Sequence, residues 1–352
     1  MAAARAVTAI LGRRLRPPSP GRRAYTCAIT RGIPSTFDRA LASESASSSS
    51  SEEEEGDASS PIISVPNARR EHAAYVSCLR EVIPRVIHLP PDEAHPDCVF
   101  VEDAAVVVGR IAVSTRMGAP SRMGEAGAVA ATLRDLGLTV LEMPPSAAAA
   151  SASAADGEED GEEGATCDGG DVLLLPPQSS PGKGTGTAAG RGPIRYMFVG
   201  LSERTNLAGA NFLADAFADV GVEVVPVPLP AAAAAPSSSS SSSSSPLHLK
   251  SIVTHVDART LLVPRGKLGD DVLRAMDAEA RGYSAVRLPD PAACNVVAAN
   301  GTVLAPESDC PETRAIFEGA MAERNLAVRY LGNGECAKCD GAMTCRSILI
   351  DL

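Results

Sequence analysis

A short order of apolar runs, turns and one helix recurs along this chain and limits the folds it can adopt. Residues 105–108 and 111–114 are apolar runs separated by a Gly-Arg pair, which predicts a β-hairpin. Apolar residues at i, i+4 and i+7 from Val129 predict a helix that Gly137 ends, and residues 138–141 follow as a strand. The predicted unit is therefore strand, strand, helix, strand.

Two pairs of segments indicate that this unit is repeated. The sequence LGL at 136–138 matches VGV at 220–222, and a Ser-x-Arg that ends at Arg116 matches one that ends at Arg204. The second unit is predicted to contain strands 172–175 and 196–201, a helix through Leu213 and Phe217, and strand 222–225. The third unit has strands 248–255 and 260–263, helix 270–280 and strand 284–288, and the fourth has strands 294–298 and 302–304, helix 312–323 and strand 326–331. The fifth unit combines the two ends of the chain, with strand 344–350 beside strand 26–30, helix 69–80 and strand 86–89.

Five such units predict an α/β fold arranged around a central axis, with the last unit closed by pairing the two ends of the chain. A site on that axis could take one residue from each unit. The alternative is that the order reflects only the alternation found in any α/β chain.

Four low-complexity segments interrupt the pattern, at about 44–60, 146–164, 176–192 and 231–246. Serine-rich, acidic or Pro/Gly-rich segments bury too little apolar surface to offset the entropy lost on ordering. We interpret them as solvated insertions in a single catalytic domain that spans residues 25–352.

Residues 1–24 have a different composition. Six arginines occur in this stretch among Ala, Leu and Ser, and the first acidic residue is Asp38. This composition is typical of a mitochondrial or plastid transit peptide. The alternative is a disordered basic tail on a cytoplasmic protein.

The remaining composition excludes several classes of function. The formal net charge is −11, the chain has no Trp, and aromatic residues are 3% of the total, which argues against a nucleic-acid partner. No apolar run approaches the roughly 18 residues that a membrane helix needs. Nine cysteines without regular spacing favour a reducing compartment over a disulfide framework.

The segment 97–103 (DCVFVED) places three carboxylates directly before the first apolar run. Burying that run brings Asp97, Glu102 and Asp103 toward the interior, where an uncompensated carboxylate is costly. A metal, an Arg or Lys side chain, or a ligand should therefore meet them. Alternation in a strand would point Glu102 away from Asp103, so the backbone must bend at residues 101–103 if both are to reach one ligand.

His248 and Cys345 are the candidates for proton transfer and nucleophilic attack. By repeat position both correspond to Asp103 and Asp171, which predicts that a thiol, an imidazole and carboxylates converge at equivalent ends of the units. The competing interpretation is a zinc or redox site built on Cys336, Cys339 and Cys345. That set lacks the fourth ligand of a structural zinc site.

Several segments resemble dimethylarginine dimethylaminohydrolases, of the guanidine-modifying superfamily. The resemblance runs from about residue 28 to residue 352, outside the four insertions. The matching segments are 97–103 (DCVFVED), 168–172 (DGGDV), 200–206 (GLSERTN), 247–251 (LHLKS) and 343–345 (MTC). The resemblance implies a five-bladed β/α-propeller, also called a pentein fold, with pseudo-fivefold symmetry.

The resemblance also implies roles for individual residues. Cys345 would be the nucleophile, His248 the general acid and base, and Asp168 the residue that orients His248. The implied substrate-binding residues are Glu102 and Asp103 on the guanidinium, Phe100 packed against it, Arg116 and Arg204 on the α-carboxylate, Asp97 on the α-amino group with carbonyls near Leu41, Cys339 and Asp340, and Ser251 in the same pocket.

The implied reaction converts Nω-methylated arginines to citrulline and methylamine or dimethylamine through a covalent thiouronium on Cys345. It needs no metal or cofactor, and the substrate guanidinium would be the cation that meets the carboxylates. Arg346 and the segment 333–338 depart from the family pattern. The alternatives are an arginine deiminase or amidinotransferase of the same superfamily, or a non-catalytic zinc or interaction protein. The oligomeric state is left open.

Overall fold

The computed structural model describes residues 25–40, 62–144, 164–177, 195–229 and 247–352. Residues 1–24, Leu41 and nearly all of the four predicted insertions lie outside these ranges. Predictions that concern them are not tested by the structure.

The described residues form five three-stranded sheets. In each sheet the middle strand pairs antiparallel with one neighbour and parallel with the other. With the middle strand written second, the sheets are β15 (Ile348–Ile350), β1 (Cys27–Arg31) and β2 (Arg85–Leu89); β3 (Ala105–Val108), β4 (Ile111–Ser114) and β5 (Thr139–Glu142); β6 (Val172–Leu174), β7 (Arg195–Leu201) and β8 (Val222–Pro228); β9 (Thr254–His255), β10 (Thr260–Pro264) and β11 (Ser284–Leu288); and β12 (Val297–Ala299), β13 (Thr302–Pro306) and β14 (Ala327–Leu331).

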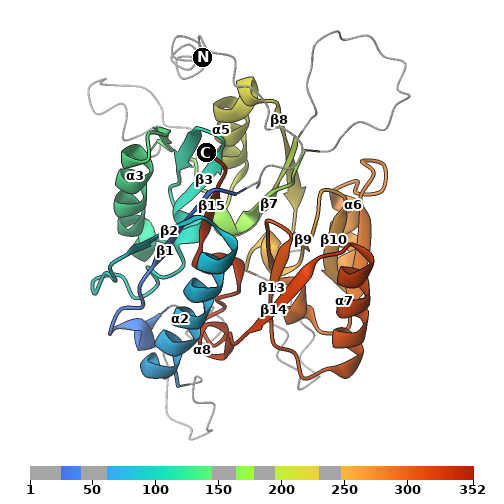
Figure 1. Ribbon diagram of the computed structural model, residues 1–352. Helices are drawn as coiled ribbons and strands as arrows, with labels where there is room; N and C mark the ends of the chain where they lie inside the picture. Colours follow the sequence, from blue (N-terminus) through green and yellow to red (C-terminus); the bar gives the residue numbers. More distant parts are fainter. Residues whose placement is uncertain (1–24, 41–61, 145–163, 178–194, 230–246) are drawn as a thin grey trace, which may run out of the picture.

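One helix connects the two parallel strands of each sheet, because parallel neighbours need a crossover connection. These helices lie around the outside of the sheets (Figure 1). They are α2 (Val65–Val82), α3 (Ala126–Asp135), α5 (Leu207–Phe217), α6 (Lys267–Ala275) and α7 (Pro311–Glu323); a short helix, α8 (Gly334–Ala337), follows β14. The predicted repeat of strand, strand, helix, strand is confirmed in all five units.

The pairing of the two chain ends is confirmed as well. β15 runs antiparallel to β1, with Cys27 opposite Ile350 and Ile29 opposite Ile348. Beyond β15, the backbone N–H of Leu352 donates to Thr26 Oγ1 at 2.9 Å. The last strand of the chain therefore completes the sheet that the first strand begins.

The core is divided into apolar clusters that join neighbouring units. In one of them, Val106 and Val113 of the second sheet pack with Met197 of the third sheet and Phe217 of α5. Because each unit buries its apolar face against the next, the units depend on one another for burial. Within the ranges that the structure describes, no helix is both long enough and apolar enough to cross a membrane.

A short 3₁₀ turn precedes the first strand of each unit, and of these turns the sequence predicted only the bend at residues 101–103. The five 3₁₀ turns are Val101–Ala104, Gly169–Asp171, Leu249–Ser251, Pro291–Cys294 and Thr344–Arg346.

Because of these 3₁₀ turns, three of the strands were predicted to begin too early. The strands predicted over 248–255, 294–298 and 344–350 are β9, β12 and β15, and each begins only after its turn. In the turns, backbone N–H groups bond within the turn or to side chains of neighbouring turns, so they are not available to a strand partner. The helix predicted over 270–280 also ends early, at Ala275, and Asp277 beyond it has a left-handed φ of 50°.

Candidate active site

Side-chain hydrogen bonds link the five 3₁₀ turns in a closed cycle. Each link joins a turn, or the residue directly after it, to the next one. The links are Asp103 Oδ1 accepting from Gly170 N (2.8 Å), Asp171 Oδ1 accepting from Leu249 N (2.8 Å), Asn295 Nδ2 donating to Lys250 O (2.9 Å), Asn295 Oδ1 accepting from Thr344 N (2.9 Å), and Thr344 Oγ1 donating to Glu102 Oε2 (2.8 Å). The turns therefore form one connected polar layer, and the candidate site lies on it.

The turns also correct the predicted repeat positions. His248 immediately precedes its turn, as Asp168 precedes the turn Gly169–Asp171, so His248 corresponds to Asp168 and not to Asp171. Cys345 is the second residue of its turn, as Glu102 is of Val101–Ala104. His248 does converge with Asp103 and Asp168, within 4.8 Å, and the turn that holds Cys345 bonds to Glu102; the predicted equivalences are shifted by one to three residues.

The predicted bend before β3 is confirmed, because residues 101–104 form a 3₁₀ turn instead of extended strand. Glu102 and Asp103 are both buried. Lys250 Nζ donates to Glu102 Oε1 at 2.6 Å, and Arg122 Nη1 donates to Asp103 Oδ2 at 2.7 Å. The prediction that the substrate supplies the missing cation was therefore wrong in part, since two protein cations already pair with these acids.

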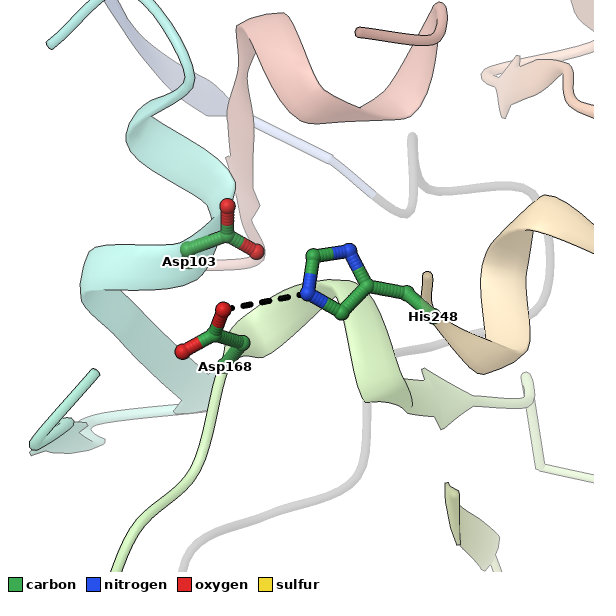
Figure 2. A group of neighbouring side chains, drawn as sticks. All are labelled: Asp103, Asp168 and His248. Carbon is green, nitrogen blue, oxygen red and sulfur yellow. Dashed lines mark hydrogen bonds and ion pairs between the residues drawn. The ribbon is translucent and has the colours of Figure 1, made fainter. Parts of the chain in front are cut away.

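Asp168 and His248 form a buried pair (Figure 2), with 3.0 Å between Oδ2 and Nε2. A carboxylate only accepts, so Nε2 carries the hydrogen and Nδ1 is the nitrogen left for proton exchange. Asp168 is fixed in turn by Gly118 N, which donates to Oδ1 at 2.8 Å. A Cβ on Gly170 would lie 2.6 Å from His248 Nδ1, so only glycine allows the ring this position.

Charge around His248 favours its protonated form. Burial opposes the charged ring, but Asp103, Asp168 and Asp171 outweigh it and raise the pKa of His248 to about 9. For Asp103, burial opposes ionisation, while the charges of His248 and Arg122 hold its pKa below the usual range. His248 and Asp103 thus support each other's charged states at neutral pH.

Cys345 is half-buried in the turn Thr344–Arg346, and Ala342 N donates to its Sγ at 3.4 Å. Burial raises the pKa of this thiol, and the carboxylates of Glu102 and Asp103 raise it further. In the absence of a ligand the thiol is therefore neutral at physiological pH. A further cation next to the thiol would lower this pKa, as the charge of Lys250 already does in part.

Phe100 and the segment after α8 form an apolar wall next to Cys345. Phe100, Cys336 and Cys339 belong to one buried cluster against which Cys345 packs. A Cβ on Gly341 would lie 2.3 Å from the Phe100 ring, so glycine allows this segment to lie on the ring.

Two further predicted residues, Asp340 and Ser251, lie next to residues already described. Asp340, whose backbone is left-handed at φ 57°, precedes the close approach of Gly341 to Phe100. Ser251 ends the turn that follows His248, and its N–H bonds to the His248 carbonyl at 3.1 Å.

Arg116 and Arg204 follow the middle strands of two neighbouring units, on loops that touch. A Cβ on Gly118 would lie 2.5 Å from the Arg204 backbone. Both arginine side chains are half-buried, and neither has a carboxylate partner among the residues that the structure describes. Asp97 is buried at 6% exposure, and it influences the pKa values of both Glu125 and Cys339.

One group of donors in the described ranges has the spacing of a metal site: Asp103, Asp168 and His248 lie within 4.8 Å of one another. All four carboxylate oxygens of the two aspartates already accept, from Arg122, Gly170, Gly118 and His248. To ligate an ion, His248 would have to lose the proton that its neighbouring aspartates favour, and the ion would lie beside the buried Arg122 guanidinium, so the donor set does not suit a metal.

The zinc alternative gains no support either. Cys339 Sγ donates to the Cys336 carbonyl at 3.2 Å, and burial raises the pKa of the Cys336 thiol to about 11. Among the described residues, these cysteines do not form a group of three ligands at metal spacing.

Sequence reasoning missed Arg122, Lys250, Thr344 and Asn295. Lys250 stands in the segment 247–251, which was singled out for its resemblance to the family, and Arg122 shortly precedes the helix predicted around Val129. The buried carboxylates were the signal that predicted a cation, but no spacing identified which one.

No family model matches the chain. The bovine protein named "Putative hydrolase DDAH2" is 30% identical over 281 residues, which are 79% of this chain and 76% of the relative. The N(G),N(G)-dimethylarginine dimethylaminohydrolase of Streptomyces coelicolor is 28% identical over 275 residues, 78% of this chain and 83% of that protein.

Solved structures show the same α/β fold. A mutant of the dimethylarginine dimethylaminohydrolase of Pseudomonas aeruginosa, complexed with citrulline, has a TM-score of 0.65 at 21% identity and covers 93% of this chain and 99% of that one. The N-terminal domain of ArgZ, a cyanobacterial arginine dihydrolase, has a TM-score of 0.61 at 19% identity and covers 92% of this chain and 97% of its own. On the identity and coverage of its sequence relatives, the chain belongs to the dimethylarginine dimethylaminohydrolase family.

Proposed function

We propose that this protein hydrolyses Nω,Nω-dimethyl-L-arginine and Nω-methyl-L-arginine to L-citrulline and dimethylamine or methylamine. The observation that carries the proposal is the cluster formed by Glu102 and Asp103, the Cys345 thiol beside them, and the His248–Asp168 pair. Paired carboxylates suit a guanidinium, and a thiol with a protonated imidazole suits covalent attack and departure of an amine.

The proposed substrate lies with its guanidinium against Glu102 and Asp103 and its flat face on Phe100. Arg116 and Arg204 bind the α-carboxylate; both residues are half-buried and have no ion pair with a carboxylate among the residues that the structure describes, which supports this role. Asp97 binds the α-amino group, with backbone carbonyls near Leu41, Cys339 and Asp340. Ser251 lines the same pocket, while Leu41 lies outside the described residues.

Binding of the substrate cation beside Cys345 offsets the carboxylates that raise the pKa of its thiol, and the thiol loses its proton to solvent. The thiolate then attacks the guanidinium carbon and forms a C–S bond. The C–N bond to the methylated nitrogen breaks with its electron pair on nitrogen, and His248 gives that nitrogen a proton. The amine leaves, and a thiouronium remains on Cys345.

Neutral His248 then takes a proton from water, and the hydroxide oxygen bonds to the thiouronium carbon. The C–S bond breaks with its pair on sulfur, and the added hydroxyl loses its proton to solvent as the C=O bond forms, which restores the thiolate and releases the neutral ureido group of citrulline. Asp168 holds the Nε2 hydrogen through both steps, so the same ring nitrogen, Nδ1, serves as acid and then as base.

We further propose that the five sheets close around one axis as a five-bladed β/α-propeller. The closed cycle of hydrogen bonds through the five 3₁₀ turns supports this arrangement, because each turn bonds to the turns of two other units. The polar layer of turns would then lie on the axis.

Product analysis tests the proposed activity. The purified protein is incubated separately with dimethylarginine, monomethylarginine and arginine, and citrulline and the released amine are quantified, with Cys345→Ala as the control. Citrulline from the methylated substrates in preference to arginine, and none from the variant, is expected. Preference for arginine would assign the protein to an arginine deiminase or dihydrolase activity instead.

A further inference from the structure

Asn295 is a buried residue whose side-chain amide joins the 3₁₀ turns of the third and fifth units. It directly follows the fourth turn, Pro291–Cys294, which supplies no residue to the proposed mechanism. Its Oδ1 accepts from Thr344 N at 2.9 Å, and its Nδ2 donates to Lys250 O at 2.9 Å and to Thr344 Oγ1 at 3.2 Å. Because a backbone N–H only donates and a carbonyl only accepts, the amide makes these bonds in one orientation alone.

The two residues that Asn295 holds are also the two that bond to the Glu102 carboxylate. Lys250 Nζ donates to Oε1 at 2.6 Å, and Thr344 Oγ1 donates to Oε2 at 2.8 Å. The hydroxyl of Thr344 has a single hydrogen, and because Asn295 Nδ2 donates to Oγ1, that hydrogen is left for Glu102. Asn295 therefore sets the direction of one bond to Glu102 and the backbone position of both residues that hold it.

These bonds act on the charge of Glu102 as well as on its position. Burial raises the pKa of Glu102, while the charge of Lys250 and the hydrogen bonds from Lys250 and Thr344 lower it. The other titratable groups around this carboxyl are Asp103, Cys345 and Tyr75. Loss of the Thr344 bond would raise the pKa of Glu102 further and favour its neutral form, which cannot form an ion pair with a guanidinium.

We infer that Asn295, acting through Thr344 and Lys250, is a positioning residue for Glu102. It keeps the carboxylate ionised and in a fixed orientation, so that the carboxylate is ready to bind the guanidinium. The fourth unit thus contributes to the site without touching the substrate. The inference rests on the proposed function for the part that concerns the substrate, but the link from Asn295 to Glu102 can be measured in the free protein.

Substitutions at three positions separate the links of this network. Asn295→Leu removes all three bonds of the amide and keeps its branched shape, while Thr344→Val removes the hydroxyl and Thr344→Ser retains it. Thr254→Val is the matched control, because it removes another buried hydroxyl, which donates to the Cys294 carbonyl directly before Asn295. If Asn295→Leu does not fold, Asn295→Ser takes its place, since one hydroxyl hydrogen cannot serve both acceptors of the amide.

The first readout is the titration of Glu102 in the free protein, by NMR of glutamate labelled with ¹³C at the carboxyl carbon and assigned by comparison with Glu102→Gln. We expect the pKa of Glu102 to rise by about one pH unit or more in Asn295→Leu and in Thr344→Val. Thr344→Ser and Thr254→Val should titrate like the wild type. An unchanged Glu102 titration in Asn295→Leu would overturn the inference, and so would an equal rise in Thr254→Val, since any loosening of the fourth unit would then move Glu102.

The second readout is the kinetics of citrulline release from dimethylarginine. In Asn295→Leu and Thr344→Val, kcat/KM should fall by about tenfold or more, with KM raised because Glu102 binds the guanidinium before the reaction. Thr344→Ser should restore most of the activity that Thr344→Val loses, and Thr254→Val should react like the wild type. Wild-type kcat/KM in Asn295→Leu would disprove the positioning role. If the wild type forms no citrulline but the Glu102 titration still follows Asn295, the proposed function fails and the link between these two residues stands.

Discussion

The turns Val101–Ala104 and Thr344–Arg346 are joined by the hydrogen bond between Thr344 and Glu102. They differ in whether the charged groups buried beside them have partners of opposite charge. At the first turn, Arg122 bonds to Asp103 and Glu125, so each buried charge has a partner. At the second, Arg346 is fully buried, donates through Nη2 to Met343 Sδ, and lies over the Tyr75 ring at 4.3 Å. Its Nε and Nη1 have no hydrogen-bond partner among the described residues.

The two turns therefore form two different halves of the candidate site. The half at Val101–Ala104 is preformed, and in the half at Thr344–Arg346 the charge of the Cys345 thiol can change. The acids at the first turn are held in place before substrate arrives. The second turn carries a neutral thiol, because burial raises the pKa of Cys345 and the charges of Glu102 and Asp103 raise it further. Under the proposed function, the charge at Cys345 therefore depends on the substrate cation, which would link activation of the nucleophile to binding of the correct group.

The largest expected effect comes from removing the thiol of the second turn. Cys345→Ala should reduce citrulline release by a factor on the order of 10⁴ or more, because no other group can form the covalent intermediate. Steady-state assays with dimethylarginine measure the loss, and Cys310→Ala, at the start of α7, is the control. Activity of the Cys345 variant within tenfold of the wild type would exclude the covalent route.

Removing the paired arginine of the first turn should have the largest effect on stability. Arg122→Met leaves Asp103 and Glu125 buried without their cation, and breaking such a pair costs about 3–5 kcal/mol. Urea unfolding followed by circular dichroism measures the change. Arg134→Met, which breaks an exposed pair, should cost less than about 1 kcal/mol, and an equal cost for the two variants would contradict the assigned role of Arg122.

The pH dependence of unfolding tests the charge state that the first turn imposes on His248. The folded-state pKa of about 9 lies above the unfolded value of about 6.5, so this group stabilises the native state fully below pH ~6.5. That contribution, about 3 kcal/mol, should be lost as the pH rises from 6.5 to 9. His248→Asn should flatten the slope relative to the wild type, and identical slopes would refute the elevated pKa.

Much of the fold could be predicted because its signals are local. Gly137 and Gly221 were predicted to end equivalent helices, and both have a left-handed φ, of 78° and 74°. The order of strands and helices along the chain followed from apolar runs of the right length, and the pairing of the chain ends followed from the incomplete fifth unit.

The site was predicted less completely because its contacts join distant parts of the chain. Lys250 and Glu102 are 148 positions apart and Thr344 and Glu102 are 242 apart, so no sequence spacing could pair them. Apart from the bend at residues 101–103, the 3₁₀ turns were missed for a related reason. Their backbone groups bond within the turn and to side chains of other units, and the apolar pattern carries no trace of those bonds.

The smallest expected effect is also the one with the opposite sign. Arg346→Met replaces a buried guanidinium that has no anionic partner among the described residues with an apolar chain of comparable length. Removing the desolvated charge should stabilise the fold, while loss of the stacking on Tyr75 costs about 1 kcal/mol, so the net change should be a gain of about 1–2 kcal/mol. Urea unfolding of Arg346→Met and Arg122→Met under the same conditions measures the expected gain in the first and the expected loss in the second. Arg346→Lys is the charge-retaining control. A loss of about 3 kcal/mol or more for Arg346→Met would mean that Arg346, like Arg122, stabilises the folded chain through its charge, and the contrast between the two turns would then be wrong.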